Sequence, residues 1–202
     1  MRGSEALERL LLYSDIQTVI DVGSGSGMQA SLIRESGRRV TTVSLMPPAD
    51  HVASFESLDL GKSYDAIWMC HVLEHTLNPH SFLQKAFRVL RDQGVLAVTV
   101  PPMKQAIVGG HINLFNAGIL LYRLIMAGFD CRDARVGIYS YNISVIVRKR
   151  AILQVPNLCM DCGDIEKIAQ FFPCQVCQGF DGRLPNIRWA IDHCSQEGGE
   201  RL

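Results

Sequence analysis

A glycine-rich turn near the N-terminus has the residue types to hold a small ligand. An apolar run ends at Asp21, and glycines follow at Gly23, Gly25 and Gly27. Backbone N–H groups bared where a strand turns into a helix attract anionic and polar ligand groups. A dinucleotide site would need a third glycine where Met28 stands, so that fingerprint fails. The turn favours a different ligand, and a glycine-rich turn with no ligand is the alternative.

Three histidines, His71, His75 and His111, follow predicted strands. Imidazole titrates near neutral pH, so such side chains can accept a proton during a reaction. His111 follows Gly109 and Gly110, which allow close approach of another group, and we expect it to be the first candidate for a base. For His75 the alternative is a structural bond to backbone at the start of a helix. For His71 the alternative is a partly buried polar side chain.

Two CxxC pairs lie eleven residues apart near the C-terminus. The four residues are Cys159, Cys162, Cys174 and Cys177. Four thiolates at such a spacing can bind a tetrahedral zinc ion. Against zinc, the spacer is typical of a helix capped by Asp164, and cysteine is also an ordinary buried residue. The alternative is a tail of one helix, IAQFF, and one strand, NIRWAI, packed over the core or across a dimer interface.

Strands and helices alternate along the chain. Apolar, β-branched runs bounded by turn residues predict strands at 18–22, 40–45, 66–70, 95–100 and 143–147. Helical periods lie at 30–35, 81–91 and 116–127. This alternation predicts a doubly wound, mostly parallel α/β sheet with helices on both faces. The last runs flank the turn-like GIYSYN and predict an antiparallel hairpin at one edge.

Length and charge narrow the class of protein. The chain has 202 residues, 48% of them hydrophobic, which suffices for one α/β core with an appendage. We expect a domain over 1–150 and a short cysteine-rich C-terminal extension over 151–202. Lys and Arg total 20 and Asp and Glu total 20, so no net charge attracts nucleic acid or an anionic membrane.

The expected location is the cytoplasm. The N-terminus carries charges throughout and does not resemble a secretory signal. The longest apolar stretch, 117–129, is short and broken by Arg123, so we expect no membrane span. Seven cysteines in a reducing compartment argue against a disulfide scaffold.

A second stretch of the sequence narrows the class of ligand that the glycine turn could bind. Residues 63–102 give an acid-led strand, a His/Glu/His loop, an amphipathic helix, a glycine break and a strand ending in Pro-Pro. Together with VIDVGSGSG this resembles the class I S-adenosylmethionine-dependent methyltransferases, in particular the LEH type (families 11 and 23). Residues 109–130 are similar to a further segment of that family. The resemblance covers residues 15–150 and implies a Rossmann-like methyltransferase fold.

The resemblance implies S-adenosylmethionine as the cofactor. Asp21 and the three glycines would hold its methionine part, flanked by Cys70 or its backbone. The family usually holds the ribose with an acid that ends the second strand, but Ser44 stands there, so binding weakens unless Asp50 reaches in. Asp59 matches the acid that receives the adenine amino group, and a plain turn acid is the alternative.

The resemblance also implies methyl transfer, and we predict O-methylation of a small molecule or glycan precursor. The candidate bases are His111, His75 and His71, while we expect Glu74 to order its loop. Ser44 and the short link between the second and fourth strands favour an alternative, a catalytically inactive methyltransferase-like binding or scaffold module. A zinc-ribbon adaptor with a vestigial core is third. A homodimer is a further expectation.

Overall fold

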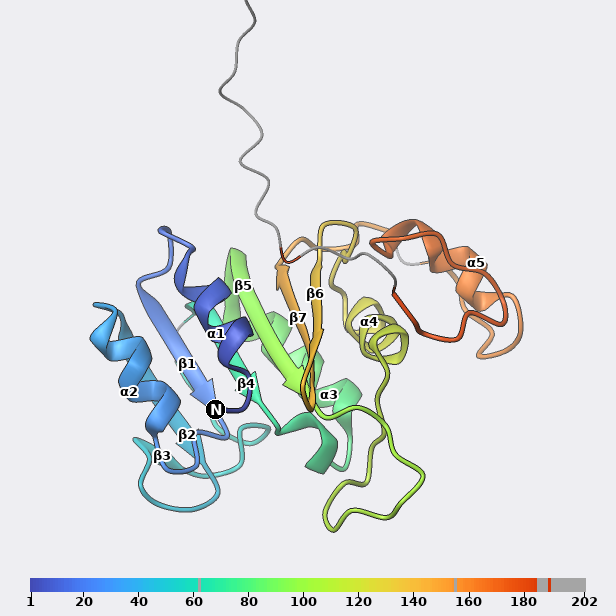
Figure 1. The fold of residues 1–202 in the computed structure, drawn as a ribbon. Coiled ribbons are helices and arrows are strands. Elements are labelled where there is room, and N and C mark those ends of the chain that lie inside the picture. Colours follow the sequence, from blue (N-terminus) through green and yellow to red (C-terminus); the bar gives the residue numbers. More distant parts are fainter. Residues whose placement is uncertain (62, 155, 185–188, 190–202) are drawn as a thin grey trace, which may run out of the picture.

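Seven strands of the described residues form one sheet, in the order β3-β2-β1-β4-β5-β7-β6 (Figure 1). The computed structural model describes residues 1–61, 63–154, 156–184 and 189. The strands are β1 (Thr18–Val22), β2 (Arg39–Ser44), β3 (His51–Val52), β4 (Tyr64–Cys70), β5 (Leu90–Val100), β6 (Arg135–Tyr139) and β7 (Asn142–Arg148). Neighbours from β3 to β5 run parallel, and β7 runs antiparallel to both β5 and β6. This confirms the predicted fold class and its edge hairpin.

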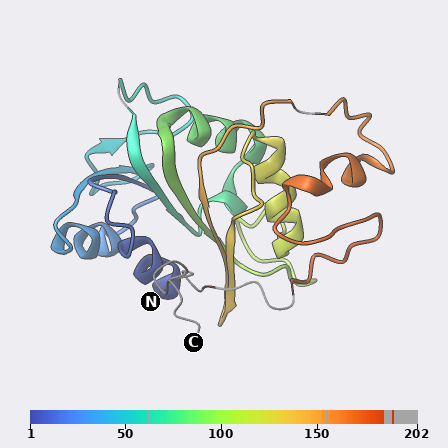
Figure 2. The ribbon, with the colours of Figure 1, turned by 90° about the horizontal axis from the view of Figure 1, so that it is seen from above.

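Helices cover both faces of the sheet (Figures 1 and 2). The helices are α1 (Ser4–Leu11), α2 (Met28–Glu35), α3 (Pro79–Val89), α4 (Ala117–Met126) and α5 (Asp164–Ile168), with 3₁₀ turns η1 (Leu73–His75) and η2 (Ala169–Phe171). α1 and α2 pack on one face, and α3, α4 and the extension pack on the other. No helix in the described ranges combines the length and the apolar character needed to cross a membrane.

Side-chain caps set the starts of α3 and α4. Asn78 accepts a hydrogen bond from the Ser81 amide, and Pro79 occupies the first helical position. Asn116 accepts from the Ile119 amide at 2.8 Å. α3 ends at Val89, two residues earlier than predicted, because Leu90 is already extended and opens β5.

β5 begins earlier than the sequence predicts, at Leu90, and the pairing of its first residues with β4 is irregular. The register between β4 and β5 shifts between Tyr64 and Ala66. A Cβ atom on Gly94 would lie 2.8 Å from the Arg91 carbonyl oxygen and 3.0 Å from that of Asp65. The glycine therefore allows the backbone to pass close to β4 where the strand bulges.

The extension beyond β7 shares the core of the sheet domain. Ile168, Phe171 and Phe172 are buried in the same apolar cluster as α4. The tail helix predicted at 168–172 begins earlier, at Asp164, and passes into a 3₁₀ turn. Its N-cap is Gly163, while the Asp164 carboxylate accepts from the amides of residues 159–161. The predicted strand at 186–191 lies outside the described residues except for one position.

Two elements were not predicted from sequence patterns. α1 lies against the sheet with Ala6, Leu7 and Leu10 buried, and the two-residue strand β3 extends the far edge beyond β2. A two-residue strand has too few positions to show any periodicity.

Asp65, the second residue of β4, ties the start of β4 to the start of β1. Its Oδ2 accepts from the Gln17 amide at 3.0 Å and from the amide and hydroxyl of Thr18 at 2.7 and 2.8 Å. Its Oδ1 pairs with Arg91. Burial pulls the pKa of Asp65 upward, but the bonds from Arg91, Thr18 and Gln17 outweigh it and hold this pKa at about 2.

We predict that Asp65→Ala lowers the free energy of unfolding by about 2 to 3 kcal/mol at pH 7, because several donors lose their acceptor. The folded pKa lies below the ordinary value of 3.8, so this stability is present above pH 4 and fades as pH falls toward 2. Urea unfolding at pH 7 and pH 3 measures both effects. Asp92→Ala, at a side chain 96% exposed, is the control and should stay near wild type. Equal stabilities of the two variants at pH 7 would contradict the role of Asp65.

Candidate cofactor and catalytic site

A cavity of about 420 Å³ opens at the carboxyl ends of β1, β2 and β4 and beside the segment after β3. Its walls include Val22 and Gly23 at the end of β1, Ser44 and Leu45 at the end of β2, Ala53 to Phe55 after β3, and His71, Val72 and His75 after β4. Ligands of open α/β sheets bind at this edge, and the volume suits a small-molecule site. Four predicted site residues, Gly23, Ser44, His71 and His75, line this one cavity.

The glycine turn between β1 and α2 is held by one carbonyl. The amides of Gly23 and Ser24 both donate to the Val43 oxygen, at 2.7 and 3.2 Å. Gly23 has φ +77°, and a Cβ atom there would lie 2.2 Å from Val72 Cγ2. Gly25 and Gly27 also have positive φ, but no side chain lies within 4 Å of a Cβ atom built on either, so the turn is open to solvent there. Neither of these two glycines lines the cavity.

Asp21 lies beneath this turn with its carboxylate out of solvent. Its Oδ2 atom is buried and has no hydrogen-bond partner, and the same holds for Oγ of Ser24. Burial raises the pKa of Asp21 to about 7, partly offset by the charge of Arg34. An unpaired buried carboxylate is costly, so a cationic group such as an ammonium or sulfonium would be stabilised beside it.

The β2 side of the cavity differs from the sequence expectations. Ser44 lines it, with Oγ accepting from the Met46 amide at 3.3 Å. Asp50 does not reach in, because its Oδ2 accepts from the amide and hydroxyl of Thr42. Asp59 accepts from the Gly61 amide at 3.0 Å and lies in a separate surface hollow. The structure therefore does not bring either carboxylate to the cavity.

Several lining residues were missed by the sequence analysis, among them Ser54 and Phe55. Ser54 and Phe55 follow the short strand β3. They line the cavity on the β3 side of β1, whereas His71 and Val72 line it on the β4 side. The Phe55 ring is buried and packs on Phe82 with 5.0 Å between ring centroids. Because β3 has only two residues, no strand pattern marked the position that follows it.

The turn after β4 places Glu74 among three histidines. Glu74 is fully buried, and neither carboxylate oxygen has a hydrogen-bond partner. Its Oε1 atom lies 3.3 Å from His71 Nδ1 and 3.7 Å from His75 Nε2, outside hydrogen-bond geometry in both cases. The His75 and His111 rings meet edge to face, with centroids 5.0 Å apart. The three predicted bases thus surround one carboxylate.

His111 reaches this cluster because the loop after β5 docks on η1. The amides of Ile112 and Asn113 both donate to the backbone oxygen of Glu74, at 3.0 and 3.1 Å. His75 Nδ1 lies 2.8 Å from the Gly110 oxygen. A Cβ atom on Gly110 would lie 3.0 Å from that same nitrogen, so glycine permits the approach. His111 itself lines a neighbouring crevice and not the main cavity.

The cysteines predicted as site residues do not line the cofactor cavity. The Cys70 side chain packs toward Trp68 and the α1 face, and burial raises the pKa of its thiol to about 11. Within the described ranges, the one group of three or more residues close enough to share a metal ion is Glu74, His75 and His111. Zinc binding by the thiols of the four predicted cysteines therefore finds no support, because these sulfurs do not gather. The amides of the first CxxC loop bond the Asp164 carboxylate instead.

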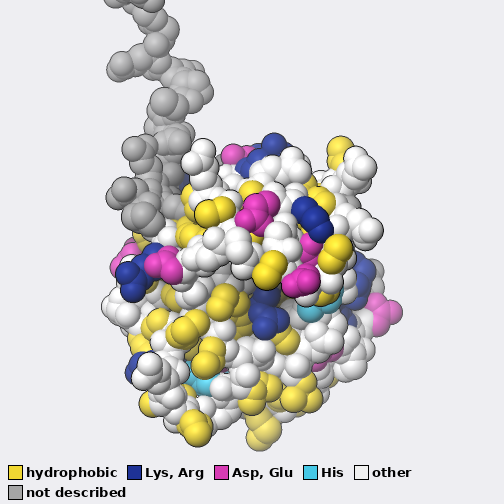
Figure 3. All heavy atoms as spheres, turned by 90° about the vertical axis from the view of Figure 1, so that its right-hand side faces the viewer, with side chains coloured by type: hydrophobic (Ala, Val, Ile, Leu, Met, Phe, Trp, Pro, Cys, Tyr) yellow, Lys and Arg dark blue, Asp and Glu magenta, His cyan; other side chains and the backbone are white. Residues whose placement is uncertain are grey.

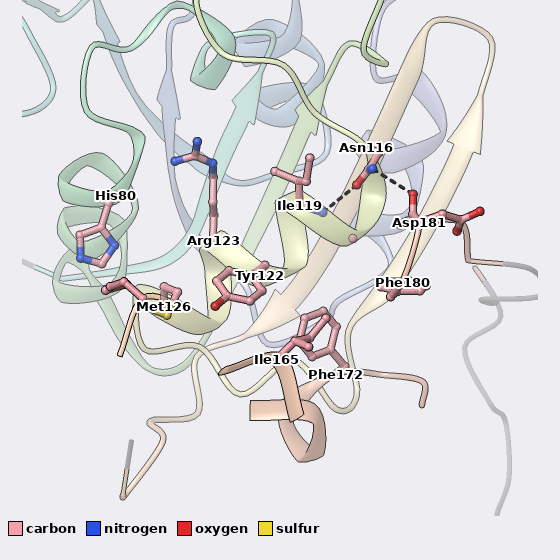
Figure 4. Close-up of a pocket in the computed structure, with 13 residues that line it drawn as sticks. His80, Asn116, Ile119, Tyr122, Arg123, Met126, Ile165, Phe172, Phe180 and Asp181 are labelled. Atoms are coloured by element: carbon pink, nitrogen blue, oxygen red, sulfur yellow. Dashed lines mark hydrogen bonds between the residues drawn. The ribbon is translucent and has the colours of Figure 1, made fainter. Parts of the chain in front are cut away.

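A second cavity of about 700 Å³ lies between α4 and the extension (Figure 4). Ile119, Tyr122 and Met126 face it from α4, and Ile165 and Phe172 from the extension. The Asn116 side-chain amide closes one end by donating to the Asp181 oxygen. On this side of the molecule, apolar side chains lie among charges of both signs (Figure 3). The second cavity shares no lining residue with the first.

The doubly wound sheet with its antiparallel edge, the open glycine turn and the cavity at the carboxyl edge have the arrangement found in the class I S-adenosylmethionine-dependent methyltransferases. A family model described as a methyltransferase domain matches residues 4–133, and the chain belongs to that family. S-adenosylmethionine is accordingly its cofactor. A search among curated proteins finds no match.

Several solved structures share the fold. A 1,6-didemethyltoxoflavin-N1-methyltransferase from Burkholderia thailandensis is 19% identical with a TM-score of 0.62, over 71% of this chain and 76% of that one. A SAM-dependent methyltransferase from Archaeoglobus fulgidus is 18% identical with a TM-score of 0.58, over 72% and 93%. The sugar N-methyltransferase KedS8 from Streptoalloteichus sp ATCC 53650 is 17% identical with a TM-score of 0.55, over 72% and 84%. At these identities the likeness concerns the fold.

We predict that Asp21→Asn removes a pH dependence of stability. The folded pKa of about 7 lies above the ordinary 3.8, so the folded chain keeps a proton that the unfolded chain releases. Stability from this group is therefore full below pH 4 and falls as pH rises toward 7. Thermal unfolding at pH 5 and pH 8 should show that wild type loses more than Asp21→Asn. Asp59→Asn should behave as wild type, and an unchanged loss in Asp21→Asn would refute the assignment.

Proposed function

We propose that this methyltransferase transfers the methyl group to a hydroxyl of a small molecule or glycan precursor. The observation that carries the proposal is the buried Glu74 beside His75 in the wall of the cofactor cavity. A hydroxyl must lose its proton as it attacks the methyl group, and a carboxylate–imidazole cluster can receive or position that proton. The N-methylations named for two similar structures are the competing reaction.

Cofactor binding would use both sides of β1. Asp21 and the backbone of the turn at Gly23 suit the ammonium and carboxylate of the methionine part. On the other side, Ser44 would bond the ribose, and the apolar wall at Phe55 would pack on adenine. This arrangement directs the sulfonium toward the β4 side, where the histidines stand. The cofactor supplies an electrophilic methyl group, and the chain aligns the acceptor oxygen in line with the carbon–sulfur bond.

His75 is the best placed of the three predicted bases to meet the acceptor. It lines the cavity, its side chain is 46% exposed, and its Nε2 atom lies 3.7 Å from Glu74 Oε1. His71 is only 6% exposed at its side chain, and its Nε2 is engaged by Asn142 at 3.0 Å. We assign His71 to orienting the carboxylate, and His111 to supporting His75 through their ring contact.

The acceptor would approach over the loop after β5 and the β6–β7 turn. Tyr141 stacks near His71, with ring centroids 6.4 Å apart, and Lys104 lies over the Tyr141 ring. Trp68 and Phe115 are fully buried and cannot contact an acceptor. We propose that residues 151–202 form an extension of the domain over 1–150 that covers α4, with a homodimer as a further proposal.

We predict that Ser44→Asp binds S-adenosylhomocysteine more tightly than wild type. A carboxylate can accept from both ribose hydroxyls where one hydroxyl makes a single neutral bond, a difference of about 1 to 3 kcal/mol. Isothermal titration measures the change. Ser57→Asp adds the same charge outside the cavity and is the matched control. Equal affinities of Ser44→Asp and Ser57→Asp would place the ribose elsewhere.

Transfer itself is tested with S-adenosylmethionine labelled in the methyl group. We expect S-adenosylhomocysteine to accumulate with hydroxylated acceptors such as phenols and sugars, and the product to carry a methyl ether by mass spectrometry. His75→Asn should lower the rate about 100-fold or more, as loss of a general base does. Methyl transfer to amines only would show that the reaction is N-methylation and not O-methylation. Absence of cofactor binding at millimolar concentration would leave a binding module without activity.

A further inference from the structure

We propose that Glu74, His75 and His111 bind a divalent transition-metal ion at the mouth of the cofactor cavity. One ligand atom from each of the three residues lies within 4.8 Å of the others. Two imidazoles and one carboxylate form a donor set that first-row dications favour. Three protein ligands leave a coordination position open toward the cavity, which His75 lines.

The first argument is the missing partner of Glu74. The side chain has no exposed area, and both of its oxygens lack a hydrogen-bond donor. A buried carboxylate without donors is expensive, and a cation beside it removes that cost. The Glu74 carboxylate therefore faces a position that suits positive charge.

The second argument is that the neighbouring imidazoles turn acceptor nitrogens toward Glu74. Asn142 Oδ1 accepts from the Gly3 amide, so the nitrogen of His71 that bonds this oxygen is a donor. In the neutral ring the other nitrogen, Nδ1, is an acceptor, and it lies 3.3 Å from Glu74 Oε1. In the same way, His75 Nδ1 donates to the Gly110 oxygen, so in the neutral ring Nε2 is an acceptor, 3.7 Å from Oε1.

Acceptor nitrogens this near a carboxylate oxygen repel it unless a cation lies beside them. A metal ion bound by Oε1 and His75 Nε2 would remove that repulsion for this pair. The bond from His75 to a backbone carbonyl is also the partner that metal-binding histidines usually have, since it fixes the ring and its tautomer. The Glu74 backbone oxygen, bonded by Ile112 and Asn113, holds the His111 loop against the same turn. His111 is half buried on that loop.

This inference deepens the proposed function. The metal site itself does not depend on O-methylation, but the role given below to its open coordination position does. An acceptor hydroxyl bound there becomes more acidic. Its O–H bond breaks and the proton passes to solvent. The new O–CH₃ bond forms as the CH₃–S bond breaks, and that electron pair stays on sulfur. His75 and His111 then act as ligands, and the metal takes over the activation of the hydroxyl.

Mn²⁺ is the probe, because it is a hard ion that prefers the oxygen of a carboxylate such as that of Glu74 over the thiols of the extension. Loss of the free-ion signal in electron paramagnetic resonance measures its binding to the full chain. We expect one equivalent in wild type and at least tenfold weaker binding in Glu74→Gln and His111→Ala. His51→Ala removes a histidine outside the cluster and should bind as wild type. His111 is half buried, so its variant tests the site even if Glu74→Gln does not fold.

Three outcomes overturn the metal site. They are no Mn²⁺ binding by wild type, equal binding by His111→Ala, or loss of binding in Cys162→Ser, which would place the ion in the extension. Binding of S-adenosylhomocysteine, measured in parallel, separates the proposals. A chain that binds S-adenosylhomocysteine but no Mn²⁺ loses only the metal site. One that binds Mn²⁺ but no S-adenosylhomocysteine keeps the metal site and loses the proposed function.

Discussion

The candidate site depends on one buried carboxylate. Glu74 has no exposed area and no hydrogen-bond donor to its side chain, although burying a charge without compensation costs several kcal/mol. Its backbone oxygen receives two amides of the loop after β5, so the same residue anchors the chain that carries His111. A carboxylate so placed needs positive charge nearby, either a proton shared with an imidazole or a metal ion. The roles of His71, His75 and His111 therefore depend on one another through this carboxylate.

The sheet order explains why this carboxylate lies beside a cofactor cavity. β2 and β3 lie on one side of β1, and β4 and β5 lie on the other, so the chain leaves the sheet in opposite directions around the end of β1. Open α/β sheets bind ligands in the crevice at this point, where the strand order reverses. The apolar packing of α3 against β4 and β5 fixes the turn at Glu74, and Val72 closes over Gly23 from that turn. A rigid core thus positions both the cofactor side and the acceptor side.

The sequence predicted the fold well because most of its signals are local. The periodicity of the strands, the Asn78–Pro79 start of α3 and the glycine turn all act within a few residues, and the structure contains each of them. The site was predicted less completely because it depends on direction and distant pairing. Asp50 and Asp59 are spaced to serve the cofactor, but Thr42 and Gly61 hold their carboxylates elsewhere. No local pattern reports that His111 meets His75 across an intervening segment that contains α3 and β5, or that four cysteines fail to converge.

Acceptor choice follows from which elements border the histidines. The described part of the extension packs on α4 and encloses a cavity whose lining residues differ from those of the cofactor cavity. The loop after β5 brings Lys104 and His111 to the site, and the β6–β7 turn brings Tyr141. In-line transfer requires the acceptor oxygen within about 3 to 3.5 Å of the methyl carbon, and we expect these two segments to hold it there. Changes in their side chains should therefore alter which acceptor is used while the cofactor site stays the same.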